Sequence, residues 1–263
     1  MTGPQAKALL PAAAAVLCFV VLAGYHQREV EAKALPAIGD TSSAMAEAAM
    51  PPLAQQGKLI FDHTPVYAKR YVGNQLSCND CHLKSGTANF SSPMIDMAGL
   101  FPSYSKRAGR VITLETRIQE CFVRSEAGLP PPAASTPMKA LVAYIDWLSR
   151  NGVKGKPYKG RGLVKLPALK GNPVAGKAIY VARCAACHGD DGAGIPSAFP
   201  PLWGKDSYND GAGMAKPAKM ARFVFHTMPQ TNPGSLTPQQ AYDVSAYVDS
   251  QPRPKFNPAY RTY

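Results

Sequence analysis

The string Cys-X-X-Cys-His occurs twice in this chain, and it constrains the fold more than any other feature of the sequence. Two thiols three positions apart lie on one side of a helical turn, where they can bond covalently to two vinyl-derived carbons of a porphyrin. The adjacent His then lies beneath the iron as an axial ligand. Each motif therefore predicts a covalently bound haem c. The predicted attachment residues are Cys78, Cys81 and His82 in the first copy, and Cys184, Cys187 and His188 in the second.

The sequence around the two motifs is also repeated. Residues 57–61 (GKLIF) resemble residues 176–180 (GKAIY), and residues 143–147 (AYIDW) resemble residues 246–249 (AYVD). A duplicated domain of roughly 80–100 residues explains this shared frame. Two other readings fit less of it: a thioredoxin-like redox pair accounts for one motif alone, and a structural zinc ion would need both Cys pairs to converge on one metal.

Most of the remaining sequence has helical patterning, and no segment shows the alternation typical of strands. Residues 237–240 (TPQQ) have the form of an N-cap, a Pro at the first helical position and a capping-box Gln. We therefore predict an all-α fold of two tandem class I cytochrome c-like domains. Helices are expected at residues 53–61, 113–124, 137–149, 173–183, 216–226 and 238–250.

The N-terminal sequence predicts export. Residues 12–23 form an apolar run that is too short to span a membrane and is typical of a signal peptide, with an uncleaved anchor as the alternative. Either form predicts that the bulk of the chain lies outside the cytoplasm and meets the membrane only through a possible N-terminal anchor. The predicted segments are a signal peptide or anchor (1–24), a leader or arm (25–52), the first cytochrome c domain (53–151), a basic linker (152–171), the second domain (172–254) and a tail (255–263).

Half of the net charge of +12 lies in the linker between the two domains. Residues 152–171 contain six Lys or Arg and no acidic residue. We interpret this segment as a solvated connector laid over both domains. Nucleic acid is not an expected partner, because no nucleic-acid-binding motif accompanies the charge.

One cysteine outside the motifs and the leader remains, Cys121, and its position in the repeat is informative. It lies 39 residues after His82, and Met228 lies 40 residues after His188. The two copies thus place sulfur at the same point, which predicts Cys121 and Met228 as the second axial ligands of the two irons. A lone Cys is otherwise most often a small buried hydrophobe. The alternative ligands are Met94, Met97 and Met138 in the first domain, and Met214, Met220 and His226 in the second.

Basic residues are concentrated near Cys121. Because Arg binds oxyanions through two parallel hydrogen bonds, the group favours an anionic substrate. On a helix, Arg124 and Ser125 would lie beside Cys121. The alternative is an ordinary solvated helix whose cations pair with Glu115, Glu120 and Glu126. The basic residues are Lys106, Arg107, Arg110, Arg117 and Arg124.

Several strings resemble the dihaem thiosulfate dehydrogenases. They are residues 71–83 (YVGNQLSCNDCHL), 101–107 (FPSYSKR), 117–125 (RIQECFVRS), 223–229 (FVFHTMP) and 243–248 (DVSAYV). The resemblance extends over about residues 53–254. The first domain is also similar to the haem subunit of the sulfur-oxidising multienzyme system.

The resemblance implies a periplasmic enzyme that joins two thiosulfates into tetrathionate, and some members of the family run the reaction in reverse. It implies that His82 and Cys121 ligate the active-site haem, that Arg107 binds the substrate, and that Ser125 belongs to the catalytic group. Electrons would leave through the second haem to a soluble periplasmic acceptor, such as a small cytochrome c or another redox protein.

The sequence departs from part of this family at the second haem. Some members have a Lys immediately before the Met ligand, whereas Thr227 precedes Met228 here. A Lys/Met exchange of ligands is therefore not expected, and His226 is the nearest alternative. Two other functions are considered: a non-catalytic dihaem electron carrier, and a haem subunit of a sulfur-oxidising complex that needs a partner protein.

Overall fold

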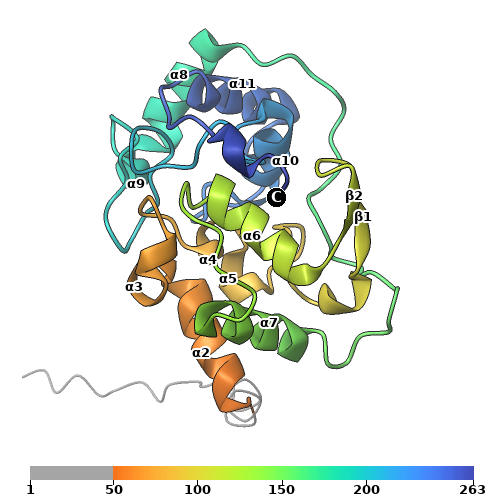
Figure 1. Ribbon diagram of the computed structural model, residues 1–263. Helices are drawn as coiled ribbons and strands as arrows, with labels where there is room; N and C mark the ends of the chain where they lie inside the picture. Colours follow the sequence, from red (N-terminus) through yellow and green to blue (C-terminus); the bar gives the residue numbers. More distant parts are fainter. Residues whose placement is uncertain (1–49) are drawn as a thin grey trace, which may run out of the picture. The chain divides into compact units, whose positions relative to one another are not determined.

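The computed structural model describes residues 50–263, all within one compact unit (Figure 1). The predicted signal peptide or anchor (1–24) and nearly all of the predicted arm lie outside the described residues. No helix within residues 50–263 is long and apolar enough to cross a membrane.

The first half of the described chain consists of short helices and one small hairpin. Helices α6 (Leu114–Arg124) and α7 (Thr136–Leu148) each begin at a side-chain N-cap, which is Thr113 for α6 and Ser135 for α7. The other elements are α2 (Pro52–Asp62), α3 (Thr64–Tyr67), η1 (Lys69–Tyr71), α4 (Cys78–Cys81), α5 (Leu83–Gly86), η2 (Ala98–Leu100), β1 (Ser103–Ser105) and β2 (Arg110–Ile112).

The second half repeats this helical frame. Its elements are α8 (Pro173–Arg183), α9 (Ala185–His188), α10 (Pro217–Thr227), α11 (Pro238–Asp249) and η3 (Pro258–Tyr260). The predicted capping box at the start of α11 is confirmed, because Thr237 accepts from the backbone of Gln240 and the Gln240 side chain accepts from the backbone of Thr237. All six predicted helices are confirmed, and each end lies within one residue of its expected position.

The expectation that the chain has no strands was wrong for residues 103–112. Strands β1 and β2 pair antiparallel, with Ser103 opposite Ile112. Gly109, in the connecting turn, has φ +66°, a left-handed conformation that glycine adopts readily. Each strand has only three residues, which is too short for an alternating pattern to be recognised in the sequence.

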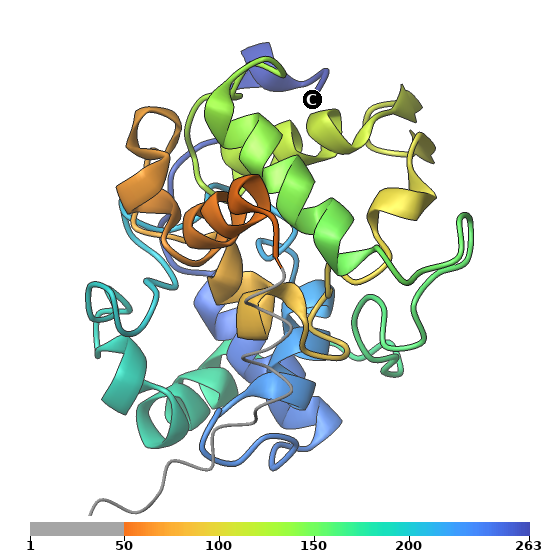
Figure 2. The same cartoon turned by 90° about the horizontal axis from the view of Figure 1, so that it is seen from below.

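In each half, the first and last helices pack closely through a glycine. Helix α2 packs on α7, and α8 packs on α11, as Figures 1 and 2 both show. A Cβ on Gly57 would overlap the carbonyl oxygen of Ala140, and a Cβ on Gly176 would overlap that of Asp243. The repeated strings of the sequence thus form the same helix crossing twice.

Each half has its own hydrophobic core. The first includes Phe61, Phe122 and Tyr144, and the second is built around Tyr180 and Trp203. The two aromatic rings of the second core lie 5.0 Å apart between centroids. Each half thus buries its own cluster of apolar side chains, as a domain does.

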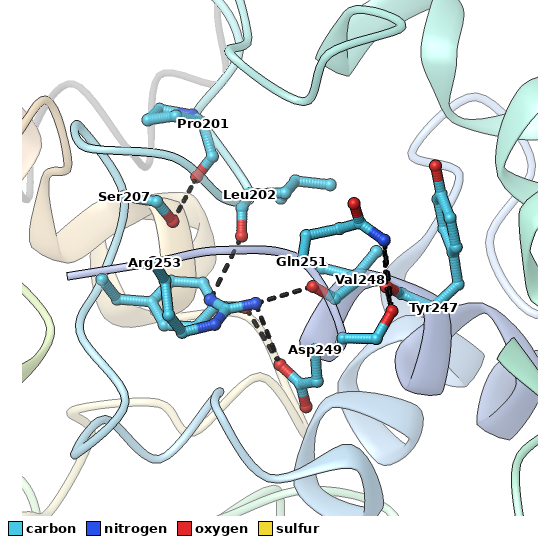
Figure 3. A network of polar contacts seen from close by, with 10 residues as sticks. Pro201, Leu202, Ser207, Tyr247, Val248, Asp249, Gln251 and Arg253 are labelled. Carbon is cyan, nitrogen blue, oxygen red and sulfur yellow. Dashed lines mark hydrogen bonds and ion pairs between the residues drawn. The ribbon is translucent and has the colours of Figure 1, made fainter. Parts of the chain in front are cut away.

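At the C-terminal end of α11, Arg253 and Asp249 form a buried ion pair (Figure 3). Arg253 lies 3.4 Å from Asp249 and donates to the carbonyl oxygens of Val248 (2.7 Å) and Leu202 (3.3 Å). Its guanidinium also lies over the ring of Tyr208. Burial raises the pKa of Asp249 to about 6, although Arg253 and the Tyr208 hydroxyl act in the opposite direction. The network fixes the chain where it leaves α11.

The two halves meet through buried polar side chains. Asn74 donates to the carbonyl oxygens of Ser125 (2.7 Å) and Ser207 (3.2 Å). Asn209 donates to the carbonyl oxygen of Val123 at 2.9 Å. Leu76, which precedes the first motif, belongs to the hydrophobic core of the second half. The segment before the first motif and the end of α6 are therefore both held against the second half.

Candidate functional site

A cavity of about 780 Å³ lies beside the first Cys-X-X-Cys-His motif. Cys78, Cys81 and His82 form part of its wall, and Cys121 of α6 forms another part. This volume lies in the range of roughly 300–1,000 Å³ that is typical of small-molecule and cofactor sites. The apolar part of the wall comprises Phe61, Leu76, Met94, Met97, Leu114, Ile118, Phe122, Leu141 and Ile145.

The first motif begins with a capping box, and both of its thiols line this cavity. The backbone N–H of Ser77 donates to Asp80 Oδ2 at 2.8 Å, and the pair caps the single turn of α4. The Thr64 hydroxyl donates to Cys78 Sγ at 3.5 Å. Burial raises the pKa of both motif thiols, Cys78 and Cys81. A thioredoxin-like pair needs a lowered thiol pKa, so this environment does not favour thiol redox chemistry.

Both motif histidines are oriented for metal binding by a carbonyl group. His82 Nδ1–H donates to the Ser92 carbonyl oxygen at 2.6 Å, and His188 Nδ1–H donates to that of Pro200 at 2.9 Å. Each bond places the ring proton on Nδ1 and leaves the Nε2 lone pair for a metal. Burial lowers the pKa of His82 to about 4, and the charge of Arg117 acts in the same direction. Each imidazole therefore has the tautomer that ligation of a haem iron requires.

Cys121 and Arg117 form a sulfur–guanidinium contact in the same cavity. They lie one turn apart on α6, and Arg117 Nη1 donates to Cys121 Sγ at 3.5 Å. The same nitrogen lies 2.9 Å from Glu120 Oε2. Cys121 thus lies on the cavity that His82 lines, as the sequence spacing requires. Met94 and Met97 also line the cavity, whereas Met138 is fully buried in the helical core. Ligation by Cys121 stays a prediction.

The second motif contains the same histidine arrangement, and its predicted sulfur ligand follows α10. Met228 is partly buried, and its backbone N–H donates to the Val224 carbonyl oxygen at 2.9 Å. The ring of the competing ligand, His226, packs edge-to-face on Phe90 of the first half, with centroids 5.4 Å apart. This aromatic contact gives His226 a packing role. Ligation by Met228 stays a prediction.

Comparison with known proteins matches each half of the chain to a family of cytochrome c domains. Residues 64–153 match the SoxA/TsdA cytochrome c domain, and residues 173–252 match cytochrome c. The thiosulfate dehydrogenase of Stutzerimonas stutzeri strain A1501 is 42% identical over 209 residues, which cover 77% of this chain and 68% of that protein. The chain belongs to the thiosulfate dehydrogenase family.

Other members of the family agree with this assignment. The thiosulfate dehydrogenase of Allochromatium vinosum is 41% identical over 212 residues, covering 76% of this chain and 78% of that protein. The solved thiosulfate dehydrogenase (TsdBA) of Marichromatium purpuratum superposes with a TM-score of 0.74 at 36% identity, covering 79% of this chain. The chain spans only 48% of the length of that protein. The predicted helix-dominated fold of two cytochrome c domains is confirmed, and the chain is a haem c-binding oxidoreductase of this family.

In this member of the thiosulfate dehydrogenase family, the two predicted residues Ser125 and Arg107 differ in their position relative to the cavity. Ser125 lines the cavity, and its backbone N–H donates to the Cys121 carbonyl oxygen at 2.7 Å. Arg107 lies in the exposed turn between β1 and β2 and does not line the cavity as residues 50–263 form it. Burial is the main cause that lowers the pKa of both Arg124 and Lys219, and the positive charge of Arg107 is the second cause. Arg107 therefore lies among cations of α6 and α10.

Two parts of the cavity wall were not expected from the sequence. Glu126 is buried there, and burial, followed by the charges of Asp80 and Cys121, raises its pKa well above the usual value. The sequence suggested Glu126 as a partner for a surface Arg, but its Oε2 has no hydrogen-bond partner among the described residues. The second part is the linker, whose Tyr158, Arg161 and Lys165 line the cavity. The only sequence signal for that role was the linker's excess of positive charge.

Proposed function

We propose that this protein oxidises thiosulfate to tetrathionate at the first cavity, with Cys121 as the sulfur acceptor. The observation that carries the proposal is the 3.5 Å contact between Arg117 Nη1 and Cys121 Sγ, on a cavity shared with His82. A guanidinium at this distance stabilises a thiolate, and a thiolate is the nucleophilic form of cysteine. The thiosulfate dehydrogenases to which the chain is similar support the choice of substrate.

Four side chains have distinct roles in this proposal. Arg117 donates a hydrogen bond to the Cys121 sulfur, and Ser125 lies on the wall beside it. Arg107, with the neighbouring cations of α6 and α10, attracts the sulfonate group and lowers the repulsion between two thiosulfate dianions. The arrangement holds two anions near one sulfur atom, which water alone does not achieve.

The reaction balances in two steps. The Cys121 thiolate and the outer sulfur of one thiosulfate form an S–S bond, giving Cys–S–S–SO₃⁻ and releasing two electrons. The outer sulfur of a second thiosulfate then attacks the sulfur bonded to Cys121. The Cys121 thiolate leaves, and tetrathionate is released. Reversal of the two steps consumes two electrons and reduces tetrathionate, so the same residues serve both directions.

The proposed cofactors are two covalently bound haems c, which when bound supply a one-electron acceptor in each domain and pass electrons onward. The residues that hold the first are Cys78, Cys81, His82 and Cys121, and those that hold the second are Cys184, Cys187, His188 and Met228. The proposed external acceptor is a soluble periplasmic redox protein such as a small cytochrome c. The proposed periplasmic location is supported by the N-terminal export sequence and by the two Cys-X-X-Cys-His motifs that follow it.

The decisive test uses two substitutions of Cys121. Cys121→Ala removes the sulfur, whereas Cys121→Met keeps a sulfur ligand that is unable to form the S–S bond. We expect both variants to retain two haems by absorption spectrum and to lose at least 99% of thiosulfate-dependent ferricyanide reduction, roughly the effect of deleting an essential nucleophile. The matched control is Met94→Leu, which changes another sulfur on the same wall.

Three results would contradict the proposal. Near-wild-type turnover of either Cys121 variant with both haems present would remove Cys121 from the chemistry. A wild-type protein that shows no thiosulfate activity, and whose ferric EPR spectrum lacks a His/thiolate signal, would be a dihaem electron carrier instead. A wild-type His/thioether spectrum that is lost in Met94→Leu but kept in Cys121→Ala would transfer the ligand role to Met94.

A further inference from the structure

The linker between the two domains forms part of the wall of the first cavity. Arg161 and Lys165 line this cavity together with three neighbouring linker residues, Pro157, Tyr158 and Gly162. The remaining wall is mostly apolar, and its other guanidinium, Arg117, is already paired with Glu120. The interpretation of the linker as a solvated connector was therefore incomplete, because two of its six cations face a cofactor-sized cavity.

The linker is fastened to the loop that orients His82. The N–H of Phe90 donates to the Gly160 carbonyl oxygen at 2.7 Å, and the N–H of Ser92 donates to that of Gly162 at 2.8 Å. The Tyr158 hydroxyl donates to Asn89 Oδ1 at 2.7 Å. The carbonyl oxygen of Ser92 in turn accepts from His82 Nδ1. The linker cations are thus attached to the His82 side of the cavity, whereas Cys121 is presented by α6.

Within the described part of the chain, these two cations have no acidic partner of their own. Neither Arg161 nor Lys165 forms an ion pair with any residue in the range 50–263. Glu126 is the one carboxyl group among the described residues that line the cavity, and burial raises its pKa well above the usual value. Both side chains are exposed, and at the rim of a mostly apolar cavity they provide hydrogen-bond donors for an anionic group of the occupant.

We propose that Arg161 and Lys165 bind the propionate carboxylates of the first haem and thereby raise its reduction potential. A haem c carries two such carboxylates, and the cations lie on the side of the cavity that holds the axial His. Reduction lowers the charge of the haem by one, so nearby cations favour the reduced form. The same oxyanion-binding chemistry also fits thiosulfate, and the experiment separates the two sources.

The test compares two double variants of the full-length holoprotein that remove equal charge from the same linker. Arg161→Gln/Lys165→Gln removes the cavity cations, and Lys156→Gln/Lys159→Gln is the control, since neither residue lines the cavity. The reduction potential of the first haem is measured by redox titration followed by absorption and EPR. We expect the equilibrium to shift about tenfold toward the oxidised form in the cavity variant, which is about 59 mV for a one-electron couple, with a much smaller shift in the control.

A conservative variant guards against an unfolding artefact. Arg161→Lys/Lys165→Arg keeps both charges, and its potential is expected to stay near that of the wild type. The proposal is overturned if the cavity variant has the same potential as the control. If in that case its KM for thiosulfate rises, the two cations serve the substrate; if KM is also unchanged, they are a solvated rim. The inference rests on a haem in the first domain but not on thiosulfate oxidation, and haem content and wild-type turnover are measured separately.

Discussion

At the scale of single residues, the contact between Arg117 and Cys121 has the largest consequence for chemistry. Arg117 lies on α6 one turn before Cys121, and its side chain is oriented by Glu120 at 2.9 Å. This carboxylate holds the guanidinium beside the sulfur. The nearby charge of Cys121 is the main cause that raises the pKa of Arg117.

We expect Arg117→Gln to lower kcat/KM for thiosulfate by about tenfold to a hundredfold, because a hydrogen bond to a charged group contributes about 1.5–3 kcal/mol. Steady-state reduction of ferricyanide by thiosulfate measures the effect. Arg150→Gln is the control, since Arg150 stacks on Trp147 at 3.8 Å and does not line the cavity. Equal activity of the two variants would show that Arg117 does not act on Cys121.

At the scale of elements, each domain depends on one helix crossing in which a glycine meets a carbonyl group. Gly57 and Gly176 are interior residues of α2 and α8, where glycine is intrinsically less favourable than alanine by about 1 kcal/mol. Close packing against α7 and α11 must outweigh this cost. The crossing also positions Tyr144, whose hydroxyl donates to the Ser85 carbonyl oxygen near the first motif at 2.6 Å.

We expect Gly57→Ala and Gly176→Ala each to lower the free energy of unfolding by about 1–3 kcal/mol, the usual cost of overpacking a rigid contact. Thermal unfolding followed by circular dichroism measures it. Gly99→Ala is the matched control, because a Cβ there meets its nearest atom at 3.5 Å, an ordinary contact. If the helix variants are as stable as the control, the crossings are looser than the structure shows.

At the scale of the whole molecule, the two domains are joined by buried hydrogen bonds across long sequence separations. The bond from Asn74 to the Ser207 carbonyl oxygen connects residues 133 positions apart. Arg124, at the end of α6, donates to the carbonyl oxygens of Gly211 and Tyr263 and lies over the ring of Phe256. These contacts hold the helix that presents Cys121 against the second domain and the tail.

We expect Asn74→Ala to lower the free energy of unfolding by about 1–3 kcal/mol, because it leaves buried carbonyl oxygens without donors. We also expect it to separate unfolding into two calorimetric transitions, one for each domain, since loss of coupling breaks two-state behaviour. Asn232→Ala, at an exposed position, is the control. A single transition shared by both variants would show that other contacts suffice to couple the domains.

Local patterning explains why so much of the helical frame was predictable. Helix α11 begins at a Thr-Pro-Gln-Gln string, and all its start signals lie within four residues. The β1–β2 hairpin was missed because its three-residue strands carry no readable period. The burial of Glu126 was not anticipated for another reason: burial is set by distant segments that pack over it, and nothing in its own neighbourhood of the sequence signals that.

The sequence by itself determined the haem motifs, the duplication and the family, because these depend on residue spacings of a few positions and on strings that repeat. Only the tertiary structure showed that Cys121, Arg117 and His82 border one cavity, that Arg107 stands apart from its wall, and that the basic linker closes one side. The physical reason is that these relations depend on contacts between segments far apart in the chain. The energy of such contacts comes from burial and complementary hydrogen bonds, which one-dimensional patterning does not encode.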